Sequence, residues 1–205
     1  MNKVINLVLF LIFVCAILFL QRDLNADNTS IPNHYVLKET PVKVIWREDV
    51  YDKDLKEKVN TIKLNENYFA NISEPEKAVL GYLATTIGNE CYSDGNKSNI
   101  KCKILSALNL SYQCSEANKT FLRGWFQGNA EIMSQVENCV AKPTSPVIEK
   151  TFDEVTISAN ANMINVKIKG LNLNFKDGTS QRWSEDMSFQ VSDNRLVLLD
   201  RKKKD

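Results

Sequence analysis

The chain has a single histidine and nearly equal numbers of basic and acidic residues, and both features narrow the possible functions. Among its 205 residues, 26 Lys and Arg balance 25 Asp and Glu, so the formal net charge is +1. That balance argues against a nucleic-acid-binding protein, which normally has a basic excess. His34 is far in sequence from every cysteine, and the seven glycines are scattered singly, so neither a nucleophile–histidine pair nor a phosphate-binding loop is expected. We therefore predict no catalytic residues and no cofactor.

An apolar run near the start of the chain predicts export. Residues 7–20 (LVLFLIFVCAILFL) follow Lys3 and precede the polar stretch 21–23, an order typical of a signal sequence. The run is shorter than the roughly 20 residues that a membrane span needs, and a good cleavage site is missing, so a cleaved signal and an uncleaved anchor both stay open. We expect a periplasmic, cell-envelope or secreted protein.

This order of segments predicts one folded domain behind a leader. We assign residues 1–20 to a signal peptide or membrane anchor, with residues 4–20 contacting the membrane. Residues 21–40 are expected to form a polar tether, and residues 41–205 a single domain.

Four of the five cysteines lie in the middle of the chain, and in an oxidising compartment such an even set predicts two disulfides. They are Cys91, Cys102, Cys114 and Cys139. Cys91–Cys102 with Cys114–Cys139 is favoured because it closes two local loops, and Cys91–Cys114 with Cys102–Cys139 is the alternative. A zinc site is disfavoured because the spacing contains no CxxC pair and no histidine lies nearby. We therefore predict no metal site.

Helical signals dominate residues 73–140. Ser73 followed by Glu76 forms a capping box ahead of an apolar helical face that ends at Gly88. Further helices are expected over residues 99–108, from Ser115 to an interruption at Gly128, and over residues 129–137.

Period-two alternation predicts hairpin-linked strands over residues 148–200 and a short strand over residues 42–46. The apolar phase shifts after Gly170, which predicts a β-bulge there. The charge-rich segment Asp49–Leu64 is compatible with either a solvated helix or a loop. The basic residues 201–204 are expected to form a solvated tail.

Helices followed by a run of strands predict an α+β fold, with the helices packed on one face of a curved antiparallel sheet. This order resembles the cystatin-like and NTF2-like arrangement, and the resemblance covers residues 74–200 by topology alone. The stretches EKAVL (76–80) and LSYQCS (110–115) also resemble small uncharacterised exported proteins of Bacteroidota, a resemblance that implies no activity.

A candidate pocket lies on the strand that contains Trp183, Glu185 and Met187. These residues alternate onto one face, which should point toward the helices, and Tyr112 is the fourth expected member. In such a pocket Glu185 could act as an acid or contact a ligand. The alternatives are that Glu185 reaches solvent or pairs with Arg182 or Lys167.

The leading hypothesis is an exported, non-enzymatic domain that binds an unknown protein or small-molecule ligand at the cell envelope. This hypothesis rests on the absence from the sequence of a nucleophile–base pair, a metal-binding cluster and a cofactor-binding loop. One alternative is an NTF2-like enzyme that uses Glu185 in an apolar pocket. Another is a secreted inhibitor or immunity protein, because small disulfide-linked domains are common scaffolds for both.

Overall fold

The computed structural model describes residues 38–86, 100–139 and 148–204, all within the compact unit Tyr35–Asp205. The predicted signal or anchor, the tether up to residue 37 and Cys91 lie outside the described residues. Lys38–Thr40, which end the predicted tether, already belong to the first strand. Among the described residues, no helix combines the length and apolar character needed to cross a bilayer.

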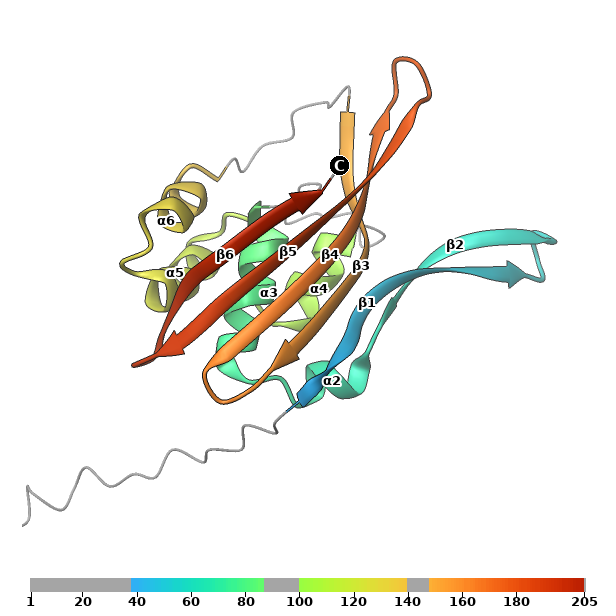
Figure 1. The fold of residues 1–205 in the computed structure, drawn as a ribbon. Helices are drawn as coiled ribbons and strands as arrows, with labels where there is room; N and C mark the ends of the chain where they lie inside the picture. Colours follow the sequence, from blue (N-terminus) through green and yellow to red (C-terminus); the bar gives the residue numbers. More distant parts are fainter. Residues whose placement is uncertain (1–37, 87–99, 140–147, 205) are drawn as a thin grey trace, which may run out of the picture. The chain divides into compact units, whose positions relative to one another are not determined.

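Six antiparallel strands form one sheet in the order β2-β1-β3-β4-β5-β6 (Figure 1). The strands are β1 (Lys38–Asp52), β2 (Glu57–Leu64), β3 (Ile148–Ala159), β4 (Met163–Asn174), β5 (Ser180–Ser192) and β6 (Arg195–Lys204). Strands β3 to β6 follow one another as a meander, and β1 pairs with β3. The first and last segments of the domain therefore share one sheet.

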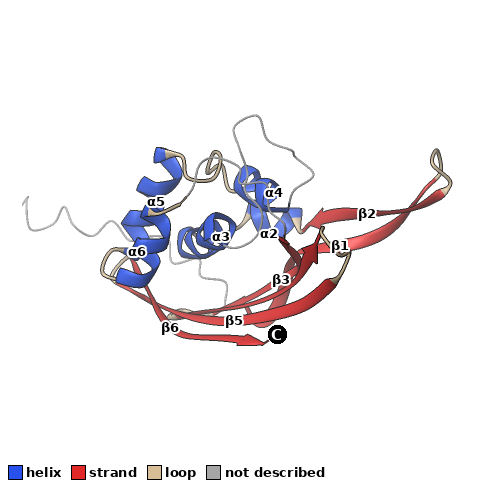
Figure 2. Cartoon of the chain, turned by 90° about the horizontal axis from the view of Figure 1, so that it is seen from above, coloured by secondary structure: helices blue, strands red, loops and turns tan. Residues whose placement is uncertain are grey.

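Five helices of the described part cover the concave side of this sheet (Figure 2). They are α2 (Glu66–Ala70), α3 (Glu74–Thr86), α4 (Ile100–Ala107), α5 (Glu116–Phe126) and α6 (Ala130–Glu137). The predicted α+β class is confirmed. We call the side of β3 to β6 that is turned away from the helices the outer face.

The core lies between helix α3 and the concave side of the sheet. Every residue of α3 from Ala78 to Thr85 is buried, as expected for a helix covered on all sides. From the sheet, β4 contributes Ile164, Val166 and Ile168, and β5 contributes alternate residues up to Phe189. Alternation along both strands separates apolar side chains from outward polar ones.

The predicted capping box at the start of α3 is confirmed. The Ser73 hydroxyl donates to Glu76 Oε2 at 2.6 Å, and the Ser73 amide donates to the same oxygen at 3.2 Å. The Tyr68 hydroxyl, on α2, donates to Glu76 Oε1 at 3.0 Å. Burial, together with the charge of Glu76, raises the pKa of Tyr68, so its proton stays available for this bond. The buried Glu76 thus joins α2 to the N-terminus of α3.

The bulge predicted at Gly170 lies in the neighbouring strand instead. Phe152 pairs with Gly170 and Glu154 with Lys169, so the extra residue is Asp153 of β3. Strand β4 keeps an unbroken register with β5. The change in apolar phase after Gly170 has another cause: the last four residues of β4 are half-buried on both faces.

The segment Asp49–Leu64 is neither a helix nor a loop but mostly a β-hairpin formed by β1 and β2. Val50 pairs with Val59 across the two strands. The Asp52 carboxylate accepts the backbone amides of Asp54 and Leu55 at 2.8 and 3.0 Å and so closes the turn. The helical spacing that starts at Leu55 is misleading, because this side chain lies at the turn and is 61% exposed.

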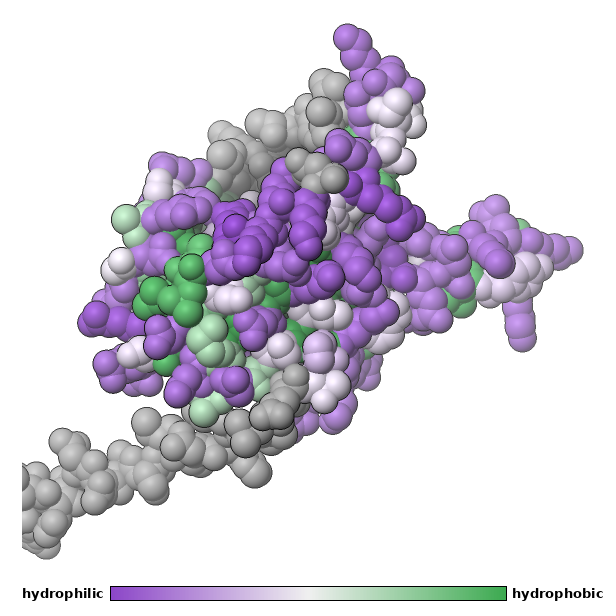
Figure 3. All heavy atoms as spheres, viewed as in Figure 1, coloured by the Kyte–Doolittle hydropathy of each residue, from purple (hydrophilic) through white to green (hydrophobic). Residues whose placement is uncertain are grey.

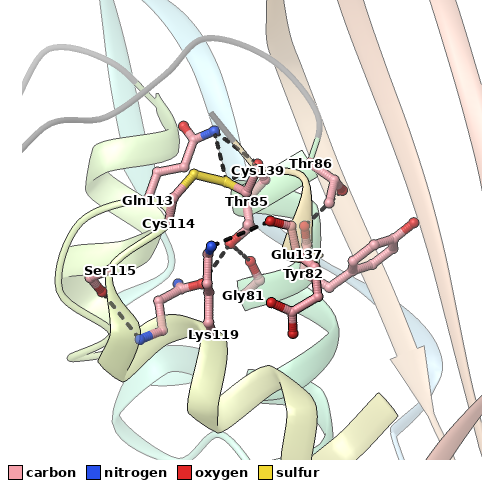
Figure 4. Close-up of a disulfide and its surroundings, with 11 residues drawn as sticks. Gly81, Tyr82, Thr85, Thr86, Gln113, Cys114, Ser115, Lys119, Glu137 and Cys139 are labelled. Carbon is pink, nitrogen blue, oxygen red and sulfur yellow. Dashed lines mark hydrogen bonds between the residues drawn. A yellow bond between two sulfur atoms is a disulfide. The ribbon is translucent and has the colours of Figure 1, made fainter. Parts of the chain in front are cut away.

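A disulfide links the segments that flank helices α5 and α6 (Figure 4). It joins Cys114, just before α5, to Cys139, just after α6, with their Cα atoms 5.6 Å apart. Beside it, Gln113 Nε2 donates to the carbonyl of Thr85 in the last turn of α3 at 3.0 Å. This pair belongs to the favoured connectivity and is incompatible with the alternative one. Cys102 is also disulfide-bonded.

Replacing both Cys114 and Cys139 by alanine should lower the free energy of unfolding by about 3 kcal/mol, because the unfolded chain regains the entropy of a closed loop. Urea denaturation without reductant measures this loss. Thr120→Ala, at an exposed position of α5, is the control and should change stability by less than about 0.5 kcal/mol. Equal midpoints for the double variant and the parent would show that no such disulfide stabilises the fold.

Ser73→Ala should cost about 1 kcal/mol of unfolding free energy, because it removes the hydroxyl that caps α3. The matched change Ser106→Ala, at an exposed position inside α4, should have little effect. A cost for Ser73→Ala no larger than that of Ser106→Ala would contradict the assigned cap.

Candidate functional site

The structure buries three of the four residues predicted to form the pocket and exposes the fourth. Trp183, Glu185 and Met187 lie on the concave side of β5 and are at most 3% exposed. Tyr112 lies in the segment between α4 and α5 and is 39% exposed. The three β5 side chains therefore point toward the helices, as expected, but they are buried and do not line an open pocket.

The carboxylate of Glu185 forms an ion pair with Arg201. Arg201 of β6 donates from Nε to Glu185 Oε1, and its Nη1 lies 3.4 Å from Glu131 Oε1 of α6. Partial burial opposes the charge on Arg201, but the hydrogen bond to Glu185, together with the electrostatic effects of Tyr82, Glu185 and Glu131, outweighs it and raises the pKa of Arg201. Arg201 therefore joins β5, β6 and α6. Neither Arg182 nor Lys167, the two partners considered from the sequence, bonds to Glu185.

The basic residues expected to form a solvated tail are part of strand β6. Their register explains the difference: Lys202 lies opposite Asp186 and Lys204 opposite Ser184, whereas Arg201 lies opposite Met187 on the concave side. Lys204 Nζ is 3.9 Å from the Asp186 carboxylate. Opposite charges directly across neighbouring strands stabilise their pairing, which extends β6 to Lys204.

Trp183 packs against side chains of β3. The ammonium of Lys150 lies 4.6 Å from the centre of its ring, and the ring of Phe152 is centred 6.4 Å away. Within the described part of the chain, its indole nitrogen is buried without a hydrogen-bond partner.

Charged and polar side chains form two rows across the outer face. The register aligns Glu154, Lys169, Ser184 and Lys204 in one row, and Thr156, Lys167, Asp186 and Lys202 in the next, each from β3 to β6. Figure 3 views the molecule from this side and shows hydrophilic side chains over much of it, with a smaller hydrophobic group near the start of β6. Val197 and Leu199 of β6 are 44% and 54% exposed.

An open depression of about 690 Å³ is lined by residues from all six strands. Its cationic residues are Arg47 on β1, Lys167 and Lys169 on β4, Arg182 on β5 and Lys204 on β6. Its carboxylates are Asp49 on β1 and Asp153 and Glu154 on β3. Strands β4 to β6 thus contribute four cations and no carboxylate, and the three carboxylates all come from β1 and β3.

The carboxylates of the depression are already engaged. Glu154 lies 2.6 Å from Lys43 Nζ and 2.8 Å from Lys169 Nζ. Burial opposes its charge, but the hydrogen bonds from the two lysines prevail and lower the pKa of Glu154. Asp49 accepts a hydrogen bond from Asn60 at 2.9 Å, and Asp153 lies 3.9 Å from Arg47. Glu154 and Asp153 thus lie beside cations, whereas Asp49 is bonded only to a neutral amide.

Two cations of the depression make no ion pair with a described residue, although Asp186 lies opposite Lys167 on the neighbouring strand. Within the part of the chain that the structure describes, the side chains of Lys167 and Arg182 have no ion pair and no hydrogen bond. Both are exposed. An exposed lysine and arginine without an ion pair in the described chain, near the cations Lys169 and Lys204, create a positive potential that attracts anions.

No group of three or more His, Cys, Asp or Glu side chains that could hold a metal ion occurs among the described residues. The chemistry of the depression is therefore that of ammonium, guanidinium, carboxylate, amide and hydroxyl groups.

The depression was not found from the sequence. The alternation in NVKIKG (165–170) does place Lys167 and Lys169 opposite the apolar residues. Which residues of β3, β5 and β6 lie beside them depends on the cross-strand register, and the sequence shows that register only in part. Comparison of the chain with protein-family models, with curated proteins and with solved structures finds no match in any of the three.

Arg201→Met should lower the free energy of unfolding by about 3 kcal/mol, because it leaves the buried Glu185 carboxylate without its counter-charge. Adding Glu185→Gln to the same chain should recover a large part of that loss. Lys204→Met, on the same strand, should cost less than about 0.5 kcal/mol. Chemical denaturation at neutral pH compares the four chains, and equal losses for Arg201→Met and Lys204→Met would refute the structural role of the ion pair.

Proposed function

We propose that this chain is an exported, non-enzymatic domain that binds an anionic partner or small ligand at the cell envelope through the depression. The observation behind the proposal is the unequal distribution of charge. Five cations and three carboxylates line the depression. Glu154 and Asp153 are paired with cations, whereas the described residues offer Lys167 and Arg182 no ion pair. An anion bound there would neutralise these two charges without displacing an existing ion pair.

The apolar run 7–20 supports export. The disulfide between Cys114 and Cys139 supports it too, because such bonds persist mainly in oxidising compartments. The cystatin-like or NTF2-like resemblance is part of the same proposal, with the helices on the concave side of the sheet and the ligand on the depression.

A binding role is favoured over catalysis at Glu185. This residue is 1% exposed and bonded to Arg201, so no substrate could reach it without opening the interface between helices and sheet. An NTF2-like enzyme that uses Glu185 is the second candidate, supported by its burial on the concave side as the sequence predicts. An inhibitor or immunity protein would use the depression toward an acidic protein surface.

The purified domain should bind trigalacturonate, a trisaccharide with three carboxylates, and not the uncharged maltotriose. Lys167→Glu with Arg182→Glu should weaken trigalacturonate binding about tenfold or more, because two attractive charges become repulsive. Binding should also weaken with added salt, which screens exposed charges. Calorimetric or NMR titration at low ionic strength gives the dissociation constants.

A double variant with the same change in charge is the control. Lys53→Glu with Arg195→Glu alters one lysine and one arginine that are exposed and do not line the depression. It should bind trigalacturonate within about twofold of the parent. Equal weakening in both double variants, or no difference between the two trisaccharides, would disprove binding at the depression.

A further inference from the structure

We infer that the ligand of the depression is an oligosaccharide with an acidic sugar at one end and neutral sugars along the rest. This inference rests on the proposed function and adds the class and orientation of the ligand. The acidic group would lie over β4 to β6, and the neutral sugars would extend toward β3, β1 and β2.

The extent of the depression favours a ligand of several units. Its lining runs from Asn60 on β2, at one edge of the sheet, to Lys204 on β6, at the other. Neighbouring strands are about 4.8 Å apart, so five steps span about 24 Å along the sheet. A single small anion would occupy only a fraction of this length.

The two halves of the depression differ in charge, and this difference sets the orientation. The β4–β6 half presents Lys167, Lys169, Arg182 and Lys204, which suit a carboxylate or another anionic group. The half from β1 to β3 presents three carboxylates and the amide of Asn60, with Arg47 as its one cation among the described lining residues. Carboxylate and amide oxygens accept hydrogen bonds, so this half suits a ligand with many hydroxyl donors.

The same polarity disfavours the other anionic polymers. A nucleic acid, with about one charge per 1.7 Å of duplex axis, would bring phosphates against Asp49 and Asp153. A uniformly acidic peptide long enough to reach β3 and β1 would meet the same repulsion. Peptides also bind through apolar or aromatic anchors, and the one large apolar residue of the lining, Trp183, is 3% exposed.

Hydroxyl side chains on the outer face could also form hydrogen bonds with a sugar. Ser184 lies between Lys169 and Lys204 in the first row, and Thr156 lies beside Lys167 in the second. Ser184 lines the depression, where its hydroxyl can both donate and accept a hydrogen bond. Such groups pair with sugar hydroxyls between the charged contacts.

The test compares 3′-sialyllactose, which has one carboxylate sugar and two neutral sugars, with free sialic acid and with lactose. The trisaccharide should bind about tenfold or more tightly than sialic acid, because linked subsites add their contributions. Lactose should bind more weakly than both. NMR titration at low ionic strength gives the three dissociation constants.

Variants in the two halves of the depression test separately the contacts to the neutral sugars and those to the acidic sugar. Asp49→Ala with Asp153→Ala should weaken binding of 3′-sialyllactose about fivefold or more and leave sialic acid within about twofold, because only the neutral sugars reach these carboxylates. Lys167→Glu with Arg182→Glu should weaken both ligands. Asp193→Ala with Asp54→Ala, at exposed turn positions that do not line the depression, is the control.

Equal affinities for sialic acid and 3′-sialyllactose would overturn this inference, and so would tighter binding of hexaglutamate or of a thymidine hexanucleotide. In each of these cases the proposed function still stands if trigalacturonate binding depends on Lys167 and Arg182. Absence of binding by every anion would disprove both.

Discussion

The unbroken register between β4 and β5 is the constraint on which the rest of the domain depends. Side chains alternate along both strands, so a shift of one residue would turn Lys167 toward the helices and Ile168 toward solvent. The observed register gives α3 a continuous apolar surface to pack on. It also aligns Lys169 with Ser184 on the outer face, so the same pairing produces the hydrophobic core and the binding surface that we propose.

Glu185 is the exception within this pattern, because it is a carboxylate at an apolar position of β5. Its charge is balanced by Arg201, which lies opposite Met187 and also reaches Glu131 of α6. A buried ion pair adds little net stability compared with apolar residues of the same size, but the loss of one partner is costly. The pair connects β6 to β5 and, through Glu131, to α6, and the cations that have no ion pair among the described residues remain on the outer face.

Local signals predicted most of the fold. The capping box at Ser73, the break at Gly128, which has a φ of +95°, and the alternation along β4 and β5 all depend on residues close in sequence. Contacts distant in sequence were missed. The hairpin of β1 and β2 requires pairing across its turn, and Arg201 becomes the partner of Glu185 only when β6 pairs with β5. The depression needs all six strands together, so no single segment indicated it.

The most direct test of the central claim is a map of backbone amide shifts in the ¹⁵N-labelled domain during titration with trigalacturonate. Our account predicts that the largest shifts fall on Lys167, Lys169, Arg182 and Ser184, with small shifts in α3 and α6. Shifts concentrated at Glu185 and α6 would place the ligand on the concave side and contradict binding at the depression.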